Sequence, residues 1–298
     1  MTRALIITNP AAARSDERHL LAARARLIAG GWAVEIARTS GSGDGERLAR
    51  AAVADGADVL IAHGGDGTAM EVAAALVGTG RALGLLPAGT GNLLAGNLRI
   101  RRSWRAAADV ILAAAPRTID VGRLTTAAGS RCFAVACGTG FDADLMRSTA
   151  AHHKRVFGMV AYVATAVGLA TNIRRARVRI EADGAVHETH AVFVLVANCG
   201  ELIPGILHLH AAIRPDDGVF DVAIFDAASV ASAARVFWRL LSRQPHADSG
   251  ITFLRASRVA ITAEPALPAQ ADGEAAGMTP LTVELLPRAL HVLAPRLG

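Results

Sequence analysis

The first half of the chain alternates short, continuously apolar runs with longer amphipathic ones. The apolar runs predict strands over residues 4–8, 34–39, 59–62 and 83–86. The amphipathic runs predict helices over residues 15–29, 46–54, 69–76 and 99–115. Because strands without polar alternation are buried on both faces, this pattern predicts a parallel sheet with helices on both sides, an α/β domain.

From residue 116 onward the pattern of apolar and polar residues changes, and one strand-like run follows another. They cover residues 118–124, 131–137, 178–182, 191–198, 220–225, 258–262, 267–271 and 282–286. Asp183-Gly184 predicts a hairpin turn, and helical stretches near 156–169 and 230–241 interrupt the strands. We therefore expect an N-terminal α/β domain over 1–116 and a β-rich, sandwich-like C-terminal domain with inserted helices over 117–289. The pattern leaves open whether residues 290–298 return to the first domain.

Polar or glycine-rich residues follow each of the four N-terminal strands. Asn9 follows the first strand and Thr39 ends the second, while glycine loops 64–68 and 89–92 follow the third and fourth. In open parallel sheets, ligands bind at the carboxyl ends of the strands. The coincidence of four such residues or loops predicts a ligand site at this edge.

The loop Gly64-Gly65-Asp66-Gly67-Thr68 is the strongest of these signals. Its glycines let main-chain N–H groups converge on an anion, and the following helix, with Thr68 as its expected N-cap, adds partial positive charge. A carboxylate at Asp66 suits a phosphate site if it holds Mg²⁺ or a water on Mg²⁺. The alternative is a tight turn with a capping aspartate.

Composition narrows the function further. The chain has 298 residues, a net charge of +5 and a pI near 10.0, which favours an anionic partner. Its one lysine, Lys154, is not in a Gly-Lys-Ser/Thr motif, which excludes a P-loop fold. Cys132, Cys137 and Cys199 are unclustered, as expected of buried thiols in a reducing compartment.

The chain shows no clear membrane-targeting signal. Its N-terminal apolar run is too short for a signal peptide. Residues 156–173 are nearly all apolar but marginal in length for a membrane span, and a buried helix is favoured over a span.

Five ordered motifs carry a resemblance to a known family. They are residues 64–68, Pro87 to Asn92, Gly138 to Ala143, Asp216-Asp217-Gly218 and Asp272-Gly273-Glu274. Together they resemble the diacylglycerol kinase and sphingosine kinase family of lipid kinases, in its single-chain bacterial form, over essentially the whole chain. The resemblance implies a nucleotide-binding α/β domain, a β-rich C-terminal domain, and ATP- and Mg²⁺-dependent phosphorylation of a lipid hydroxyl.

The resemblance also implies roles for individual residues. Glu274 would be the general base and Asp66 the second catalytic residue. A structural Mg²⁺ would use the Asp217 carboxylate with the carbonyls of Arg214 and Val219, although a plain turn would use the same residues. The implied ATP-binding residues are Asn9, Thr39, Gly64, Gly65, Asp66, Gly67, Thr68, Gly89, Thr90 and Asn92. Asp120 and Asp272 match positions of an acidic network.

The chain departs from the family pattern in three places, of which Leu93 concerns the catalytic network. Leu93 replaces a frequent aspartate, Ala12-Ala13 replaces Ser-Gly, and His210-Ala211 replaces Ala-Pro. They leave the acceptor open among diacylglycerol, a sphingoid base and a glycerophospholipid. The alternative functions are an NAD kinase-like phosphotransferase, which the motifs at 87–92 and 272–274 fit poorly, and a catalytically idle lipid- or nucleotide-binding protein.

The remaining expectations concern partners and location. Arginines gather at 99–105 and at Arg174, Arg175, Arg177 and Arg179. They are interpreted as solvated faces or as a patch for anionic lipid. We expect a lipid substrate, a transient anionic membrane surface and no nucleic acid, in a cytoplasmic protein peripheral to the inner membrane face. A homodimer is left open, and His208 and His210 are favoured as a solvated pair over a metal site.

Overall fold

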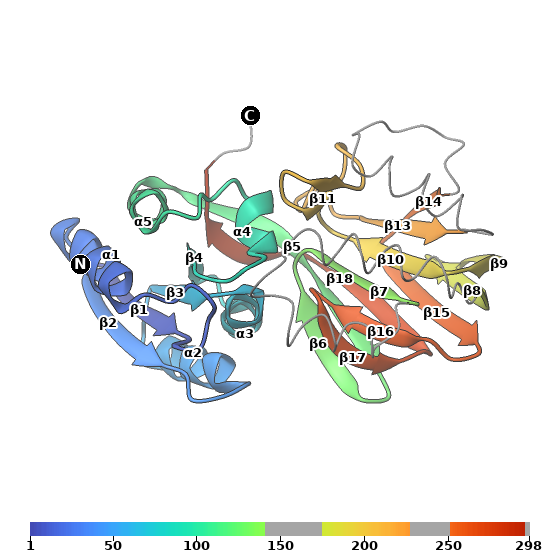
Figure 1. Ribbon diagram of the computed structural model, residues 1–298, viewed down its shortest axis with the longest axis horizontal. Helices are drawn as coiled ribbons and strands as arrows, with labels where there is room; N and C mark the ends of the chain where they lie inside the picture. The colour runs from blue at the N-terminus through green and yellow to red at the C-terminus, as the bar shows by residue number, and fades with distance from the viewer. Residues whose placement is uncertain (141–174, 227–250, 296–298) are drawn as a thin grey trace. The chain divides into compact units, whose positions relative to one another are not determined.

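The computed structural model describes residues 1–140, 175–226 and 251–295 (Figure 1). The expected helices near 156–169 and 230–241, and with them the apolar stretch 156–173, lie outside the described residues. The chain forms two compact units, one of Met1–Val121 with Pro287–Gly298 and one of Gly122–Leu286. None of the described helices has the length and apolar character needed to cross a bilayer.

The N-terminal unit is built on four parallel strands in the order β2-β1-β3-β4. Their bounds are β1 Arg3–Thr8, β2 Ala33–Arg38, β3 Val59–Gly64 and β4 Ala82–Pro87. The helices are α1 Glu17–Ala29, α2 Asp44–Ala54, α3 Asp66–Leu76, α4 Leu93–Asn97 and α5 Trp104–Ala113. Helices α1 and α5 pack together on one face of the sheet and α2 and α3 on the other (Figure 1), which confirms the predicted α/β class.

Helix α3 begins inside the glycine loop, three residues earlier than predicted. Its N-cap is Gly65, so the expectation that Thr68 caps this helix is wrong. Asp66 occupies the first turn, where its carboxylate complements the positive end of the helix dipole. The early start places the carboxylate at the carboxyl end of β3.

Two strands, β5 and β18, each begin in one unit and end in the other. The predicted domain boundary after residue 116 falls inside β5 (Pro116–Thr126), which continues past the unit boundary at Val121. Strand β18 (Leu281–Leu293) begins in the C-terminal unit and ends in the N-terminal one, where His291 and Val292 pair in parallel with Ala82 and Leu83 of β4. The last described residues therefore complete the N-terminal unit.

The C-terminal unit is a β sandwich-like structure of antiparallel strands. One set pairs in the order β18-β15-β8-β9 and the other in the order β14-β13-β10-β7-β16-β17. The additional strands are β6 Gly129–Phe133, β7 Ala136–Thr139, β8 Ala176–Ala182, β9 Ala185–Ala191, β10 Phe193–Ala197, β11 Glu201–Ile203, β12 Leu207–His208, β13 Phe220–Phe225, β14 Ile251–Ala256, β15 Arg258–Glu264, β16 Pro268–Ala271 and β17 Glu274–Met278.

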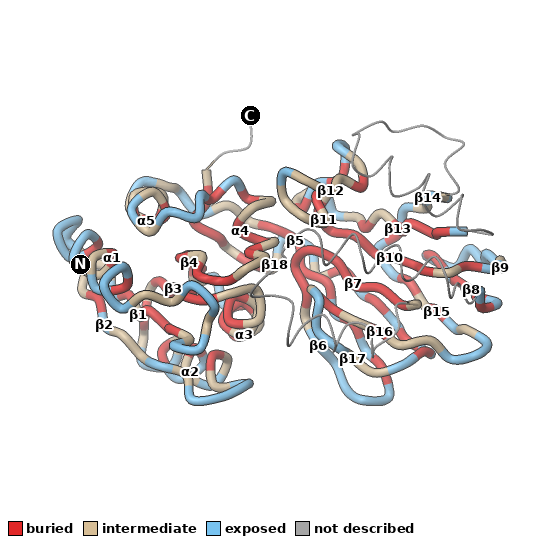
Figure 2. The backbone as a smooth tube through the Cα atoms, in the orientation of Figure 1, coloured by how far each residue is buried: buried red, intermediate tan, exposed pale blue. Residues whose placement is uncertain are grey.

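The core of this unit draws on both sets of strands. Val178 and Ile180 of β8 share one buried cluster with Val194 and Val196 of β10 (Figure 2). Strand β8 alternates strictly between buried and exposed residues, as a strand with one face on a core does. The predicted hairpin at Asp183-Gly184 is confirmed, since both residues have positive φ, 46° and 88°, and join β8 to β9.

Candidate active site

The carboxyl ends of the four parallel strands are tied together by main-chain hydrogen bonds. The Asn9 N–H donates to the His63 carbonyl at 3.0 Å, and the Thr39 N–H donates to the Thr8 carbonyl at 2.9 Å. The Ala88 N–H donates to the Gly64 carbonyl at 2.8 Å. The structure thus brings Asn9, Thr39 and both glycine loops to one edge of one sheet.

The two glycine loops touch each other directly. A Cβ on Gly89 would overlap the Cα of Gly65, so glycine at position 89 is required by the close approach of the backbones. A Cβ on Gly64 would likewise overlap the side chain of Thr68, which is buried beside it. The contact therefore packs the backbones of the two loops directly against each other.

Asn92 closes the second loop from within. It has a left-handed backbone conformation, with φ of 51°, and its side chain is buried. Its Oδ1 accepts from the Gly89 N–H at 2.9 Å and its Nδ2 donates to the Gly89 carbonyl at 2.8 Å. Both ends of the amide are therefore engaged in holding the loop, so any contribution of this residue to ATP binding includes positioning the loop.

The Asp66 carboxylate joins the two loops. Its Oδ1 accepts from the Leu93 N–H, 2.5 Å away at the start of α4, and its Oδ2 lies against Gly91, where a Cβ would be 2.7 Å away. Burial raises the pKa of Asp66, and the backbone N–H groups oppose this effect. A divalent cation beside the carboxylate would lower the pKa again.

A small cavity lies beside the same carboxylate. It measures about 10 Å³ and is lined by Gly65, Asp66, Pro87 and Asn92 among others. That volume is about what one water needs. Apart from Asp66 and Asn92, its lining consists of glycines, Pro87 and aliphatic side chains, so Asp66 is the one charged residue in the lining.

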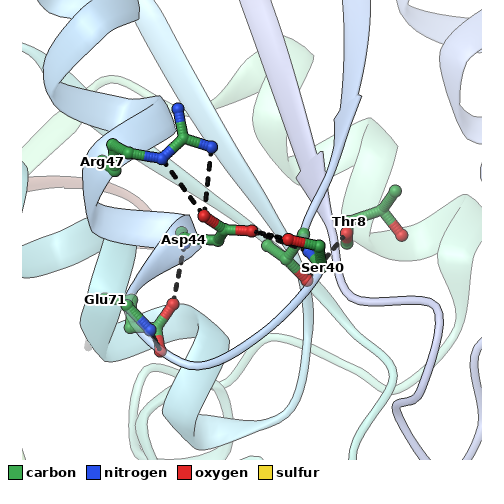
Figure 3. A network of polar contacts seen from close by, with 8 residues as sticks. Thr8, Ser40, Asp44, Arg47 and Glu71 are labelled. Atoms are coloured by element: carbon green, nitrogen blue, oxygen red, sulfur yellow. Dashed lines mark hydrogen bonds and ion pairs between the residues drawn. The ribbon is translucent and has the colours of Figure 1, made fainter.

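The loop between β2 and α2 has its own polar network (Figure 3). The Asp44 carboxylate accepts from the N–H and hydroxyl of Ser40 and from the Arg47 guanidinium. Chiefly through the Ser40 hydroxyl, these bonds lower the pKa of Asp44 to about 2. The network holds the loop directly after Thr39, whose hydroxyl donates to the Thr8 carbonyl at 3.4 Å.

Glu71 of α3 is a residue that sequence reasoning missed. Its carboxylate accepts from the N–H groups of Gly43 and Gly45 at 2.7 and 2.8 Å, and so ties the start of α2 to α3 (Figure 3). The available signal was one acid in the otherwise apolar stretch 69–76. A carboxylate there satisfies amides of the first turn of α2.

Glu274 lies in the C-terminal unit, at the start of β17. The preceding residues Asp272 and Gly273 both have positive φ, 46° and 85°, so the predicted turn is present. Glu274 is exposed and forms an ion pair with Arg131. A carboxylate paired in this way must leave the guanidinium, or share it, to accept a proton.

Asp272 has a different part in the same turn. Its carboxylate accepts from three successive main-chain N–H groups, those of Ala134, Val135 and Ala136, at 2.8, 3.0 and 2.9 Å. Asp120, in the N-terminal unit, is fully buried and accepts from the Arg288 N–H at 2.7 Å. Both aspartates of the expected acidic network thus accept hydrogen bonds from main-chain N–H groups. Their part in catalysis stays a prediction.

The structure predicts a large stability loss for Asp272→Ala. Three N–H groups would lose a charged acceptor, and each hydrogen bond to a charged group contributes about 1.5–3 kcal/mol. We expect the free energy of unfolding to fall by about 3 kcal/mol or more, measured by urea denaturation. Asp226→Ala, which removes an exposed carboxylate paired with Arg175, is the control. Equal stability of the two variants would contradict the anchoring role.

The residues of the expected structural Mg²⁺ site already have partners. The Asp217 carboxylate accepts from Arg255 at 2.8 Å, and the Arg214 guanidinium donates to Asp216 at 3.1 Å. Asp217 also accepts from the Val219 N–H at 3.4 Å. These contacts use the Asp217 carboxylate, the Arg214 guanidinium and the Val219 N–H, and do not involve the Arg214 and Val219 carbonyls expected to bind the cation. The site at Arg214, Asp217 and Val219 therefore stays a prediction.

The histidine pair His208 and His210 and the arginine run on β8 also contact other side chains of the protein. The ring of His210 packs edge-on against Phe253, whereas Nδ1 of His208 lies 3.8 Å from Glu201. Among the described residues, no three His, Cys, Asp or Glu side chains are grouped to hold a metal ion. Of the arginine run on β8, Arg177 and Arg179 both pair with Glu188, so this stretch carries less free charge than its sequence suggests.

Comparison with known proteins places these features in a family. Residues 3–124 match the diacylglycerol kinase catalytic domain, and residues 135–294 match the YegS C-terminal NAD kinase beta sandwich-like domain. The chain therefore belongs to the diacylglycerol kinase and YegS-like family of lipid kinases, which confirms the resemblance. It is a phosphotransferase of the lipid kinase class.

Individual relatives match over nearly the whole chain. The diacylglycerol kinase of Bacillus subtilis (strain 168) is 29% identical over 99% of this chain and 97% of its own length. A "probable lipid kinase YegS-like" protein of Chromohalobacter salexigens is 31% identical over 97% and 92%. A crystal structure of a diacylglycerol kinase from Bacillus anthracis str. Sterne, 22% identical, superposes with a TM-score of 0.77 over 98% of this chain and 97% of its own, and shows the shared fold.

Proposed function

We propose that the protein transfers the γ-phosphoryl group of Mg-ATP to a hydroxyl of a lipid such as diacylglycerol, a sphingoid base or a glycerophospholipid. The observation that carries this proposal is the pair of glycine loops that touch at the carboxyl edge of the sheet, with the Asp66 carboxylate between them. Phosphoryl transfer depends mainly on positioning and charge stabilisation, which such a surface can supply.

The roles follow from the chemistry of each group. The N–H groups of loops 64–68 and 89–92 would hold the phosphates, and Asp66 would hold Mg²⁺ directly or through water. When bound, Mg²⁺ supplies positive charge that neutralises the phosphate oxygens. Glu274 would accept the proton of the lipid hydroxyl. Asn9, Thr39 and the loop between β2 and α2, to which Glu71 is hydrogen-bonded, would hold the nucleotide.

The test of this proposal is a transfer assay with radiolabelled ATP. Diacylglycerol, sphingosine and phosphatidylglycerol are presented in mixed micelles, with NAD⁺ as a parallel soluble acceptor. Labelled lipid that requires Mg²⁺ supports the proposal and identifies the acceptor. Label on NAD⁺ alone would favour an NAD kinase-like activity, and transfer to none of these acceptors, despite ATP binding, would favour an idle binding protein.

We also propose that the protein works in the cytoplasm at the inner face of the membrane, where its lipid lies. The stretch 99–105 carries four arginines, Arg99, Arg101, Arg102 and Arg105, and each basic residue near an anionic surface contributes about 1 kcal/mol. Because Arg177 and Arg179 are both paired with Glu188 on β9, we assign the larger share of the attraction to anionic lipid to the stretch 99–105.

This predicts salt-sensitive recruitment to vesicles. Co-sedimentation with phosphatidylglycerol vesicles should be strong in dilute buffer and weak at about 1 M salt, where the screening length falls to about 3 Å. Arg101→Gln combined with Arg105→Gln should weaken it, and Arg177→Gln combined with Arg179→Gln, which also removes two charges, should serve as the matched control. Binding that is insensitive to salt would point to hydrophobic insertion instead.

A further inference from the structure

The expected general base, Glu274, shares its carboxylate with a guanidinium of the same unit. Nη1 of Arg131, in β6, donates a hydrogen bond to Oε2 of Glu274, in β17. The two side chains are 47% and 53% exposed. An ion pair this exposed contributes little to stability, because water and salt screen it. The guanidinium can therefore exchange the carboxylate for a stronger partner at small cost.

The strands that carry this ion pair are fastened to each other. Strand β17 runs beside β6 (Figure 1). Just before β17, the Asp272 carboxylate accepts from the three N–H groups of residues 134–136, which directly follow β6. Near the end of β17, the Thr126 hydroxyl donates to the Ala276 carbonyl at 2.8 Å. The backbone thus keeps the guanidinium and the carboxylate of Glu274 side by side.

The hairpin of β5 and β6 carries a second arginine, Arg123, on its other face. Arg131 lies opposite Leu124 in the ladder, whereas Arg123 lies opposite Cys132. Because successive residues of a strand point to opposite faces, the two arginines belong to different faces of the hairpin. Arg123 pairs with Glu284, 3.8 Å away. The same hairpin therefore supplies one guanidinium to the expected general base and a comparable one that is directed elsewhere.

On the function proposed above, phosphoryl transfer changes what the Arg131 guanidinium faces. The lipid hydroxyl gives its proton to Glu274 while its oxygen forms a bond to the γ-phosphorus of ATP. The bond from that phosphorus to the β–γ bridging oxygen breaks, and ADP leaves with the electron pair. The carboxyl group is then neutral, and a charged phosphate monoester stands on the oxygen that had been hydrogen-bonded to it. A group on that oxygen lies within reach of the guanidinium that touches the same carboxyl group.

We propose that Arg131 binds the newly formed phosphate of the lipid product, which it takes in exchange for Glu274 as that residue receives the proton. A planar guanidinium offers two parallel N–H groups to phosphate oxygens, and such charge-assisted bonds are stronger than a bond to a neutral carboxyl group. The exposed ion pair that is given up is weak, whereas the product gains a cation beside its new charge. Arg131 is thus a product-binding residue.

Isothermal titration calorimetry with two soluble lipid phosphates, dioctanoyl phosphatidic acid and octyl phosphate, tests the proposal on the full chain. Arg131→Gln should weaken binding by about 10-fold, since it removes a charge-assisted partner. Arg131→Lys keeps the charge without the planar fork and should recover part of the loss. Arg123→Gln is the matched control and should leave binding unchanged. Equal losses in the two glutamine variants, or no saturable binding of either probe, would overturn the proposal.

Combined variants test the exchange of partners. Glu274→Gln imitates the neutral carboxyl group, so with Arg131 present it should tighten binding of dioctanoyl phosphatidic acid by about 5-fold. In the Arg131→Gln background the same change should alter binding by about 2-fold or less, because no guanidinium is left to release. An equal gain in both backgrounds would mean that Glu274 merely repels the phosphate, and would overturn the exchange. Absence of labelled lipid in the transfer assay would count against the proposed function alone, because these titrations need neither nucleotide nor turnover.

Discussion

Asp66→Asn should reduce phosphoryl transfer by about 10³-fold or more while the fold survives. The asparagine keeps an oxygen that can accept from the Leu93 N–H at the start of α4, so the contact between the two glycine loops should persist. What it removes is the negative charge that would hold Mg²⁺. Metal-based charge stabilisation contributes several kcal/mol, and each 1.36 kcal/mol corresponds to a factor of ten in rate.

Three measurements on the same variant separate charge from structure. Thermal unfolding should be close to that of the parent protein, turnover should collapse, and the Mg²⁺ concentration for half-maximal activity should rise. Asp109→Asn, which removes an exposed carboxylate paired with Arg26, is the matched control in the same unit. Turnover of Asp66→Asn within a few-fold of the parent protein would contradict the metal role.

Glu274→Gln should leave ATP affinity nearly intact, because the glycine loops belong to the other unit. Turnover should fall by on the order of 10²–10⁴-fold, the usual contribution of a positioned general base. The loose transition state of phosphoryl transfer needs little nucleophilic push, so the loss could sit at the lower end.

Equilibrium ATP binding and single-turnover transfer distinguish these outcomes. Glu284→Gln offers a close control, because Glu284 is similarly exposed and paired with an arginine, Arg123, in the same unit. If ATP binding and turnover fell together in Glu274→Gln, the residue would belong to the nucleotide or metal site. The general-base assignment would then be wrong.

The fold could be predicted from sequence because its strands have simple environments. Strand β3, buried along its length, reads as a continuous apolar run, and β8, with one buried face, reads as an alternation. Helix starts were harder to predict. The start of α3 at Asp66 depends on a loop folded against Gly89 and Leu93, more than twenty residues later in the sequence.

In the candidate site too, some features could be predicted from the sequence and others depend on contacts between distant residues. Its glycine loops could be predicted because close backbone approach requires glycine itself. The role of Glu71 could not, because it depends on α3 lying beside the start of α2. Asp272 and Glu274 were grouped by one motif, yet Asp272 holds three amides while Glu274 is exposed beside Arg131. Sequence proximity carries no information on that difference.

The return of β18 to the N-terminal unit has a consequence for synthesis on the ribosome. Residues 1–121 are made first. Strand β4 can pair with β3 at once, but it acquires its second neighbour, β18, only when His291 and Val292 have been translated and have left the exit tunnel. Until then one side of β4 presents unpaired N–H and C=O groups to any passing strand. The nascent chain thus passes through a long interval of exposure to aggregation, in which chaperone capture would matter most. A chain truncated before His291 would leave the first-made unit, rather than the later-made one, incomplete.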